Sequence, residues 1–403
     1  MKRRFSILLV SAVIVGLTLS LFEAALVSQA APEPTQRKIV VFQTWFVNDV
    51  AQDELINRLG GAKIKDLNLI SAKAVHLPPR AEAALARQFG VLRIDDDVVV
   101  EALVRGGIAA KKPAPTQPSE VLPWGVDRID ADLVQGTTTG DPIKVAIVDT
   151  GIDVKHPDLI DNLKGGVSTV WYTTKYNDDN GHGTHVAGIA AAVDNTIGVI
   201  GVGPQIDLYA VKVLDRRGSG YLSDVIEGLD WAIQNGMQVV NMSLGTSAYN
   251  KSFEDAVKKV NAAGITQVAA AGNSGPGDNT VTYPAKFTEV IAVSATDKFD
   301  TIASWSSRGP EIDLAAPGVS IYSTYKGSTY KTLSGTSMAA PHVTGAAALV
   351  LTQTAKCDTD LSGSCSPAEV QQRLEATAED LGTADRDDLY GSGLVDAEAA
   401  VIE

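Results

Sequence analysis

A serine at the start of an apolar helix is the first group in this sequence that could do chemistry. The segment Gly335–His342 reads GTSMAAPH, and the apolar pattern predicts a helix over Met338–Leu351. A backbone N–H at a helix start has no partner within the helix and can stabilise an oxyanion. Ser337 could therefore attack a carbonyl carbon, or it could simply cap the helix. Pro341 is expected in the first helical turn, where its missing N–H costs nothing.

A serine nucleophile needs a base that takes its proton and a carboxylate that holds this base. His182 lies in the segment Asn180–Gly188, NGHGTHVAG, where the flanking glycines let neighbouring groups approach closely. Asp149 ends the apolar strand predicted over Lys144–Asp149. A carboxylate in that position suits an active-site rim better than a core, although aspartates that begin turns are also common. Asp149, His182 and Ser337 therefore supply the three roles.

Three segments of the chain resemble the signature motifs of the subtilisin-like serine peptidases (subtilases). They are VDTG at Val148–Gly151, GHGTHVAG at Gly181–Gly188 and GTSMAAPH at Gly335–His342. The chain order Asp, His, Ser is the known order of subtilisin itself. The resemblance covers residues 120–403 and implies a serine endopeptidase with Asp149, His182 and Ser337 as its catalytic triad.

The resemblance also implies roles for residues around the scissile bond. Asn273 follows a predicted strand and matches the family's oxyanion asparagine, which would act beside the Ser337 N–H. Two small-residue stretches are implied to pair with an extended peptide and to line the first specificity pocket. These stretches and one further pocket position comprise Ser243, Leu244, Gly245, Ala270, Ala271, Gly272 and Thr282. Since no acidic residue is among them, we expect a broad, mainly apolar preference.

Calcium is the cofactor that the resemblance implies, in a structural role. Carboxylate, amide and carbonyl oxygens together suit this hard cation, and a polar loop follows the predicted helix of His182. The implied ligands are the side chains of Asp158 and Asn195 and the carbonyls of Val193, Ile197 and Val199. A glutamine that the family supplies from the mature N-terminus has no obvious counterpart, and Glu120 stands nearest. Solvated surface acids are the alternative interpretation.

Two cysteines, Cys357 and Cys365, lie eight residues apart in a polar loop. In an exported protein such a pair predicts a local disulfide. Asp358 and Asp360 lie between them, and on their own they are too short a signal to predict a second metal site.

The first 30 residues are typical of a secretory signal peptide. Basic residues precede an uncharged apolar run over Phe5–Phe22, and small residues follow at Ser28 and Ala30. We therefore predict residues 1–30 as a signal peptide and the protein as secreted and extracellular. The apolar run is barely long enough to span a bilayer. A membrane-tethered processing protease with an uncleaved segment therefore stays open.

Residues 31–110 are predicted to form an inhibitory propeptide domain. Strand and helix patterns follow in the order β-α-β-β-α-β, which is the split ferredoxin-like motif, with a last strand over Val91–Leu103. The position and pattern resemble the inhibitory propeptide of the subtilases, and an unrelated accessory α/β domain is the alternative. Residues 111–118 are predicted as a linker that carries the maturation site. Residues 119–403 then form the peptidase domain.

The peptidase domain is predicted as an α/β fold with a mainly parallel sheet and helices on both faces, preceded by the small α+β ferredoxin-like domain. Short apolar runs of buried-strand type alternate with helical patterns, and active groups of such sheets lie at the carboxyl ends of strands. The predicted strands are Lys144–Asp149, Leu208–Leu214, Gln238–Ser243, Gln267–Ala271 and Val290–Ser294. The predicted helices are His185–Val193, Tyr221–Asn235, Ser252–Ala263, Met338–Leu351 and Pro367–Ala378.

Composition and charge limit the classes of partner. The 403 residues are 45% hydrophobic, enough for a substantial core, and the net charge is −14. Residues 119–403 carry 19 Lys and Arg against 37 Asp and Glu, which argues against nucleic-acid binding. We expect a monomer whose partners are protein or peptide substrates and its own propeptide as inhibitor. A non-catalytic binding protein on a subtilase scaffold is the competing class, although this chain keeps all four catalytic groups.

Overall fold

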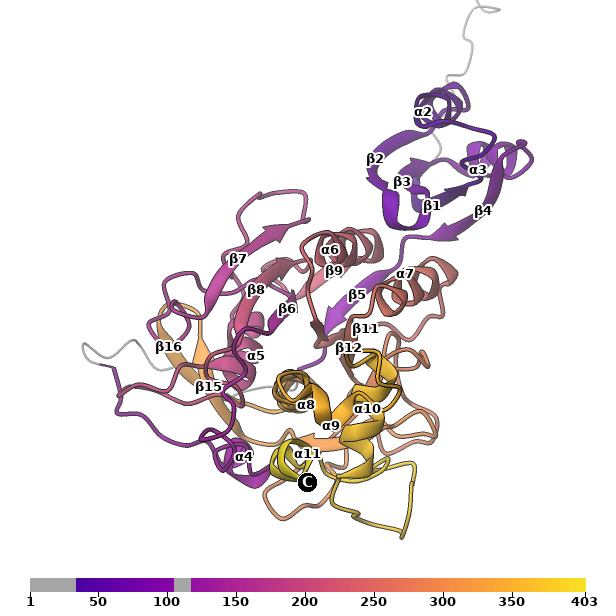
Figure 1. Ribbon diagram of the computed structural model, residues 1–403. Coiled ribbons are helices and arrows are strands. Elements are labelled where there is room, and N and C mark those ends of the chain that lie inside the picture. The colour runs from indigo at the N-terminus through magenta and orange to yellow at the C-terminus, as the bar shows by residue number, and fades with distance from the viewer. Residues whose placement is uncertain (1–33, 105–116) are drawn as a thin grey trace, which may run out of the picture.

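The computed structural model describes residues 34–104 and 117–403 and shows a small N-terminal domain seated on a larger body (Figure 1). The predicted signal peptide, residues 1–30, lies outside the described residues, as does most of the predicted linker, residues 111–118. Across the two described ranges, every helix is too short or too polar to cross a membrane.

The N-terminal domain is an antiparallel four-stranded sheet in the order β2-β3-β1-β4 with two helices on one face. Its elements are β1 (Gln36–Phe42), α2 (Asp49–Arg58), β2 (Ala62–Leu67), the 3₁₀ turn η2 (Asn68–Ile70), β3 (Ala72–Leu77), α3 (Pro79–Leu85) and β4 (Val91–Asp96). Successive side chains of β1 point to opposite faces. Val40 and Phe42 pack with the domain's own helices, whereas Ile39 and Val41 join the core of the large domain. The predicted ferredoxin-like arrangement is therefore confirmed.

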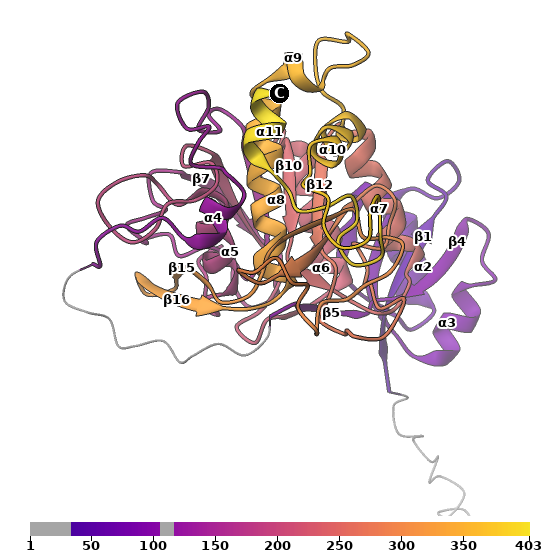
Figure 2. The same ribbon diagram turned by 90° about the horizontal axis from the view of Figure 1, so that it is seen from below.

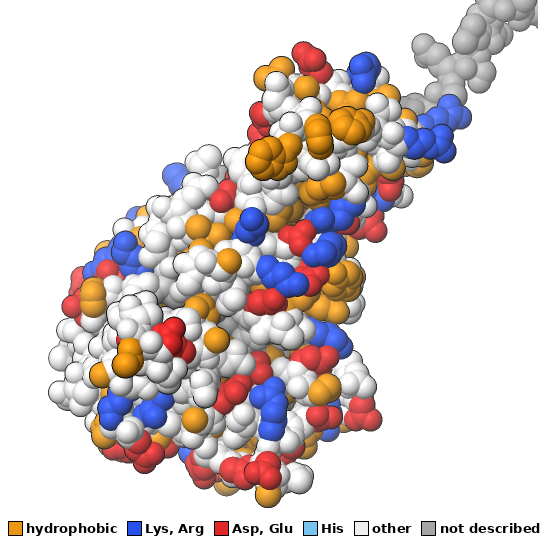
Figure 3. Space-filling view, turned by 45° about the vertical axis from the view of Figure 1, so that its right-hand side comes forward, with side chains coloured by type: hydrophobic (Ala, Val, Ile, Leu, Met, Phe, Trp, Pro, Cys, Tyr) orange, Lys and Arg blue, Asp and Glu red, His pale blue; other side chains and the backbone are white. Residues whose placement is uncertain are grey.

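The predicted last strand of this domain, Val91–Leu103, is wrong as one continuous strand. It divides into β4 and β5 (Val99–Ala102), and β5 leaves the small domain and pairs with strands of the large domain. Asp97 lies between the two strands, and its carboxylate accepts hydrogen bonds from the Ser223 N–H and hydroxyl, at 2.8 and 2.9 Å, and pairs with Arg37 at 2.8 Å. Lys, Arg, Asp and Glu side chains gather along the same junction of the two domains (Figure 3).

The large domain is built on a seven-stranded sheet in which every neighbouring pair is parallel, as predicted. From edge to edge the strands are β14 (Leu314–Pro317), β13 (Ile291–Thr296), β12 (Thr266–Ala270), β10 (Val239–Met242), β6 (Lys144–Asp149), β8 (Asp207–Lys212) and β7 (Leu163–Ser168). Both edge strands are absent from the prediction. β7 contains glycines and polar residues, and β14 has only four residues. Neither strand therefore shows the apolar pattern of a buried strand.

Helices cover both faces of this sheet (Figure 2). The helices are α4 (Trp124–Arg128), α5 (His182–Ala191), α6 (Leu222–Gln234), α7 (Lys251–Ala262), α8 (Thr336–Leu351), α9 (Thr354–Cys357), α10 (Pro367–Ala376) and α11 (Ala397–Ile402). Residues of β6 alternate between the two cores. Val145 and Ile147 pack with α5 and α8, whereas Ala146 and Val148 pack with α6 and α7. The predicted fold class is confirmed.

Helix α8 begins at Thr336, so Pro341 lies inside the helix, and its predicted place in the first turn is wrong. A proline in a helix interior deprives the carbonyl four residues earlier of its donor. Here that carbonyl belongs to Ser337, and it accepts a hydrogen bond from the Ser243 hydroxyl at 3.0 Å instead. The strand end at Ser243 therefore compensates for the proline and ties the start of α8 to the sheet.

Candidate active site

The carboxyl ends of three neighbouring strands and the starts of two helices bring the candidate catalytic residues to one edge of the sheet. Asp149 is the last residue of β6, Ser243 follows β10, and Asn273 lies three residues beyond β12. His182 is the first residue of α5, three residues earlier than the predicted start, and Ser337 is the second residue of α8. The parallel sheet explains this convergence, since its strands all end on the same side.

Asp149 and His182 form a close buried pair. The His182 Nδ1 atom lies 2.8 Å from both carboxylate oxygens of Asp149. His182 is 2% exposed and Asp149 is 0% exposed. The Nε2 atom of His182 has no hydrogen-bond partner among the described residues. The carboxylate therefore favours the tautomer with the proton on Nδ1, which leaves Nε2 as a free acceptor. A general base needs this arrangement.

The Ser337 hydroxyl is not hydrogen bonded to His182 in this structure. Its Oγ–H donates to the Ser243 carbonyl oxygen at 2.9 Å. Catalytic hydrogen bonds are often long or misaligned without a substrate and shorten when it binds. The structure therefore joins Asp149 to His182 and leaves the serine–histidine contact unformed.

The backbone of Leu103 is hydrogen bonded to both Ser337 and Ser243. Its oxygen accepts a hydrogen bond from the Ser337 N–H at 3.3 Å, and the Leu103 N–H donates to the Ser243 carbonyl at 3.2 Å. The side-chain oxygen of Asn273 accepts from the Thr336 N–H and hydroxyl, at 3.0 and 3.2 Å. Because its oxygen is held by Thr336, the Asn273 NH₂ group remains available as a donor to a third group.

The segment before Leu103 lies between two strands of the large domain. β5 pairs antiparallel with β11 (Leu244–Gly245) on one side and with β9 (Ser219–Tyr221) on the other. The Ser243–Gly245 stretch therefore pairs with an extended segment of this same chain. The partner β9 was missed, since three residues of sequence SGY carry no strand pattern.

The side chain of Leu103 lies against the residues expected to line the first pocket. A Cβ atom added to Gly245 would come within 3.0 Å of Leu103 Cδ1 and 2.7 Å of Thr282 Oγ1. Thr282 is held by the Ala271 carbonyl, which accepts from its N–H and its hydroxyl at 2.9 and 3.2 Å. The missing side chain of Gly245 thus leaves space beside the Leu103 side chain, and Thr282 borders this space.

The remaining expected pocket residues lie deeper. Ala270 is the last residue of β12 and belongs to the core beneath α8. Gly272 has φ +119, a region that favours glycine, and an added Cβ would approach Ser307 Oγ to 2.7 Å. Leu244 is fully buried in the same apolar cluster as Val100, which precedes Leu103 by three residues.

A buried carboxylate that the sequence interpretation missed connects the Asp149 strand to the His182 helix. One oxygen of Asp178 accepts from the Thr150 hydroxyl at 2.9 Å and from the N–H groups of Asn180 and Gly181 at 2.8 Å. The other accepts from the Thr184 N–H and hydroxyl, at 3.0 and 2.6 Å. Burial raises the pKa of Asp178, and these hydrogen bonds oppose the rise. Asp178 therefore fixes both partners of the pair relative to each other.

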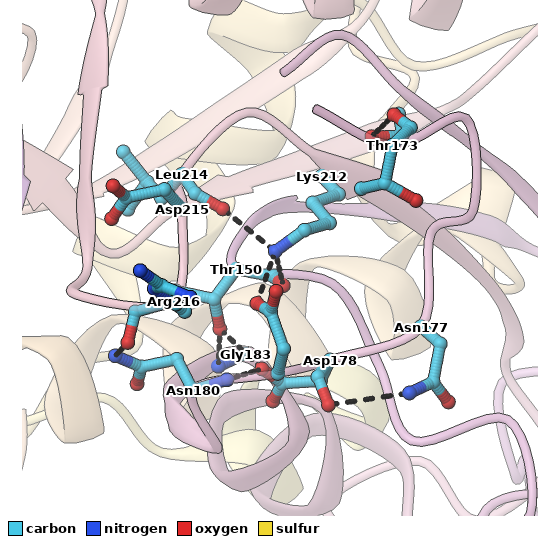
Figure 4. Close-up of polar contacts among 12 residues, drawn as sticks. Thr150, Thr173, Asn177, Asp178, Asn180, Gly183, Lys212, Leu214, Asp215 and Arg216 are labelled. Atoms are coloured by element: carbon cyan, nitrogen blue, oxygen red, sulfur yellow. Dashed lines mark hydrogen bonds and ion pairs between the residues drawn. The ribbon is translucent and has the colours of Figure 1, made fainter. Parts of the chain in front are cut away.

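Lys212 supports the same loop from the neighbouring strand β8. Its side chain is fully buried, and Nζ donates to the carbonyls of Thr150 and Leu214 at 2.7 and 2.9 Å. It also forms an ion pair with Asp179 at 2.7 Å. Figure 4 shows Lys212 between Thr150 and Leu214. The register of the sheet pairs Lys212 directly with Asp149, so the lysine holds the backbone just after the candidate catalytic carboxylate.

The expected calcium ligands lie around one loop, residues 193–199, which Asp158 and Glu120 contact. Asp158 is fully buried, and its oxygens accept from the Asn195 amide and the Val199 N–H, each at 2.9 Å. Burial raises the pKa of Asp158 to about 6. Glu120 accepts from the Asn195 N–H at 2.7 Å. In the described chain no donor reaches the backbone carbonyls of Val193, Ile197 and Val199. Two carboxylates, an amide and free carbonyls suit Ca²⁺.

The other histidines near the site are buried and have structural contacts. His185 lies within reach of the carbonyls of Ile321 and Lys331, and burial lowers its pKa to about 3. His342 contacts the Met338 carbonyl at 2.8 Å, and burial lowers its pKa to about 4. Both are therefore neutral near pH 7. The predicted disulfide between Cys357 and Cys365 is confirmed.

The sequence is similar to known proteases over most of its length. The model of the subtilase family (Peptidase_S8) matches residues 140–393. Subtilisin DY from Bacillus licheniformis is 48% identical over 285 residues, which are 70% of this chain and 99% of that protein. An alkaline protease from Alkalihalobacillus alcalophilus is 39% identical over 397 residues, 96% of each chain. The second match extends over the N-terminal domain as well as the large one.

Proposed function

This chain belongs to the subtilase family and is a serine endopeptidase, and on that premise we propose that Asp149, His182 and Ser337 are its catalytic triad. Ser337 Oγ attacks the peptide carbonyl, and its proton passes to His182 Nε2. His182 then protonates the leaving amine, and water hydrolyses the acyl-enzyme by the same route. Asp149 stabilises the imidazolium. The observation that carries this proposal is the buried Asp149–His182 pair with its free Nε2 atom.

The oxyanion would be stabilised by the Ser337 N–H and the side-chain NH₂ of Asn273. The contact from the Ser337 N–H to the Leu103 carbonyl supports the first donor. The second is supported by the hydrogen bonds that turn the Asn273 oxygen toward Thr336. In subtilisin itself, removal of the equivalent asparagine is a known example that costs about 10²–10³ in rate. We expect a loss of similar size in Asn273→Ala.

Substrates would bind as an extended strand between β9 and β11. The chain's own β5 occupies this position, and its backbone pairs with both neighbours. Main-chain pairing is largely independent of side chains, which supports a broad endopeptidase. The small-residue wall around Gly245 supports an apolar preference in the first pocket.

We further infer that the protein is a zymogen that cuts the Leu103–Val104 bond itself. The maturation site would then lie at the end of β5 rather than in the expected linker 111–118, and the propeptide would end at Leu103. The Leu103 carbonyl lies against the candidate oxyanion donor, as the carbonyl of a scissile bond must. After cleavage the N-terminal domain would stay bound through β5 and the Asp97–Ser223 contact, and so inhibit the enzyme.

A test of self-processing compares the wild type with Ser337→Ala in a protease-free host. Mass spectrometry of the wild type should find a mature chain that begins at Val104, whereas Ser337→Ala should remain uncut at this bond. Normal processing of Ser337→Ala would overturn self-cleavage. A mature chain that begins within 111–118 would overturn the assignment of the bond.

A calcium ion would be held by Asp158, Asn195, Glu120 and the carbonyls of Val193, Ile197 and Val199. Bound calcium would supply structural stabilisation of this loop, since it offsets the burial of the Asp158 carboxylate. The raised pKa of Asp158 and the carbonyls without donors support this assignment.

Secretion is proposed from the N-terminal sequence pattern and from the disulfide, which is typical of oxidising compartments. A membrane-tethered protease is the second candidate, on the ground of the long apolar run over Phe5–Phe22. Mass spectrometry of the protein's N-terminus separates the two. Casein hydrolysis by purified protein, with and without a serine-directed inhibitor, tests catalysis against a non-catalytic binding role.

A further inference from the structure

The segment Asp358–Glu369 between α9 and α10 has the residue pattern of an EF-hand calcium loop. It reads DTDLSGSCSPAE, twelve residues. In an EF-hand, oxygen ligands come from positions 1, 3, 5, 7, 9 and 12, with glycine at position 6 and glutamate at position 12. Positions 1, 3, 5, 6, 7, 9 and 12 of this segment are, in that order, Asp358, Asp360, Ser362, Gly363, Ser364, Ser366 and Glu369. Serine replaces the usual aspartate or asparagine at position 5 and keeps a side-chain oxygen. We propose that this loop binds one Ca²⁺ ion as an isolated EF-hand.

The three carboxylates of this pattern also lie close together in space. One oxygen each from Asp358, Asp360 and Glu369 lie within 4.8 Å of one another. Ligands of one calcium ion lie up to about 5 Å apart, since each is about 2.3–2.6 Å from the ion. Within residues 34–104 and 117–403, none of the three has an ion pair with Lys or Arg. All three carboxylates accept hydrogen bonds from N–H groups or hydroxyls of the loop, and a divalent cation would neutralise most of their charge.

The pattern explains residues that acidic clustering alone would not require. Gly363 has φ +92, the left-handed backbone that glycine allows at the sharp turn of position 6. Ser362 and Ser366 place hydroxyl oxygens at positions 5 and 9, and Ser364 at position 7 offers its backbone carbonyl oxygen, which accepts from the Ser362 hydroxyl at 2.9 Å. Glu369 lies in the first turn of α10, so a helix carries the residue at position 12, as in a helix–loop–helix unit.

The disulfide gives this single loop a constraint of its own. Cys357 immediately precedes position 1, and Cys365 is position 8, so the bond closes the loop on itself. A closed loop loses less conformational entropy when it orders around an ion. The site is distinct from that proposed at Asp158, because α9 and α10 lie well away from β15 (Ile321–Tyr325) and β16 (Thr329–Leu333), beside which Asp158 is buried (Figure 2). Affinities of extracellular EF-hand-like modules, about 10⁻⁴–10⁻³ M, are the expected range.

Isothermal titration of calcium into the chelator-treated full chain tests the proposal. The Ser337→Ala background prevents self-digestion, and Asp360→Asn is the primary variant because Asp360 is exposed and caps no helix. Glu369→Gln is the second variant, and Asp388→Asn is the control that removes an exposed carboxylate outside the loop. We expect Asp360→Asn and Glu369→Gln to weaken one calcium site by at least about tenfold, since affinity follows ligand charge. Asp388→Asn should bind like the background protein.

Two results separate this loop from the site at Asp158. Asp158→Asn should leave the EF-hand titration intact, so failure of the Asp158 site would not remove the signal assigned to the loop. Circular dichroism and an intact disulfide by mass spectrometry establish that each variant is folded. Calcium stoichiometry and affinity that are unchanged in folded Asp360→Asn would overturn the proposal, and so would an equal loss in Asp388→Asn.

Discussion

Replacement of Leu103 by alanine should slow the first cleavage of the precursor without unfolding it. The change removes three carbon groups, each worth about 0.8 kcal/mol when fully buried. Leu103 is only partly buried in the pocket beside Gly245, so we expect about half of the full value, about 1–1.5 kcal/mol. Since 1.4 kcal/mol corresponds to a factor of ten, processing should slow by about 5–15-fold. The backbone contacts of Leu103 are unaffected, so the cut should stay at the same bond.

The assay follows conversion of refolded precursor by gel electrophoresis, with mass spectrometry of the new N-terminus. Leu92→Ala is the matched control, because it is the same substitution on β4 at a side chain that is 58% exposed and so loses little burial. It should process at the wild-type rate. Equal rates for Leu103→Ala and Leu92→Ala would refute the assignment of the pocket. A moved cleavage site would refute the assignment of the bond.

Four further predictions follow from the geometry. Asp178→Asn, which can no longer accept at both oxygens, should lower kcat by about tenfold or more with KM little changed; an unchanged kcat would exclude a positioning role. Burial holds the pKa of His342 at about 4, below its ordinary value of 6.5, so the contribution of His342 to stability should fall by up to about 3 kcal/mol as pH drops from 6.5 to 4. Denaturant unfolding of inactivated protein at pH 7 and pH 4.5 measures the change in the free energy of unfolding. A His342→Gln variant that loses as much stability between these pH values as the unsubstituted protein would contradict this prediction. Asp97→Asn should weaken inhibition by the cleaved N-terminal domain about 10–100-fold, because the Ser223 donors lose a charged acceptor; an unchanged inhibition constant would count against this contact. Chelation of calcium should lower the Tm of the wild type. It should lower the Tm of Asp158→Asn by less, because the calcium site at Asp158 is already weakened in this variant.

The parallel sheet was predictable because its central strands are buried on both faces and read as short apolar runs. β6 spans the same residues that the pattern predicts, Lys144–Asp149. The edge strand β7 contains two glycines, and its strand conformation comes from pairing with β8 rather than from its own residues. Where the predicted last propeptide strand divides, Asp97 is hydrogen bonded to a residue of the other domain, Ser223, and the sequence pattern does not show this contact.

The candidate triad was predictable because its residues lie in three long motifs with the right order. Asp178 was missed because its role consists of hydrogen bonds to groups that only the fold assembles. Leu103 was missed for the same reason, although an apolar residue at the end of the last strand, just before a Gly- and Lys-rich stretch, was an available signal. The role of Pro341 was misjudged because its compensating donor, Ser243, is distant in sequence.

The most direct test of the central claim is to identify the residue that a serine-directed phosphonate labels. The purified mature enzyme is treated until casein hydrolysis stops and is then digested for peptide mass spectrometry. We expect one adduct per molecule, on the peptide that contains Ser337, and loss of hydrolysis in proportion to labelling. Hydrolysis that continues with Ser337 fully labelled, or inactivation through a different residue, would contradict the account.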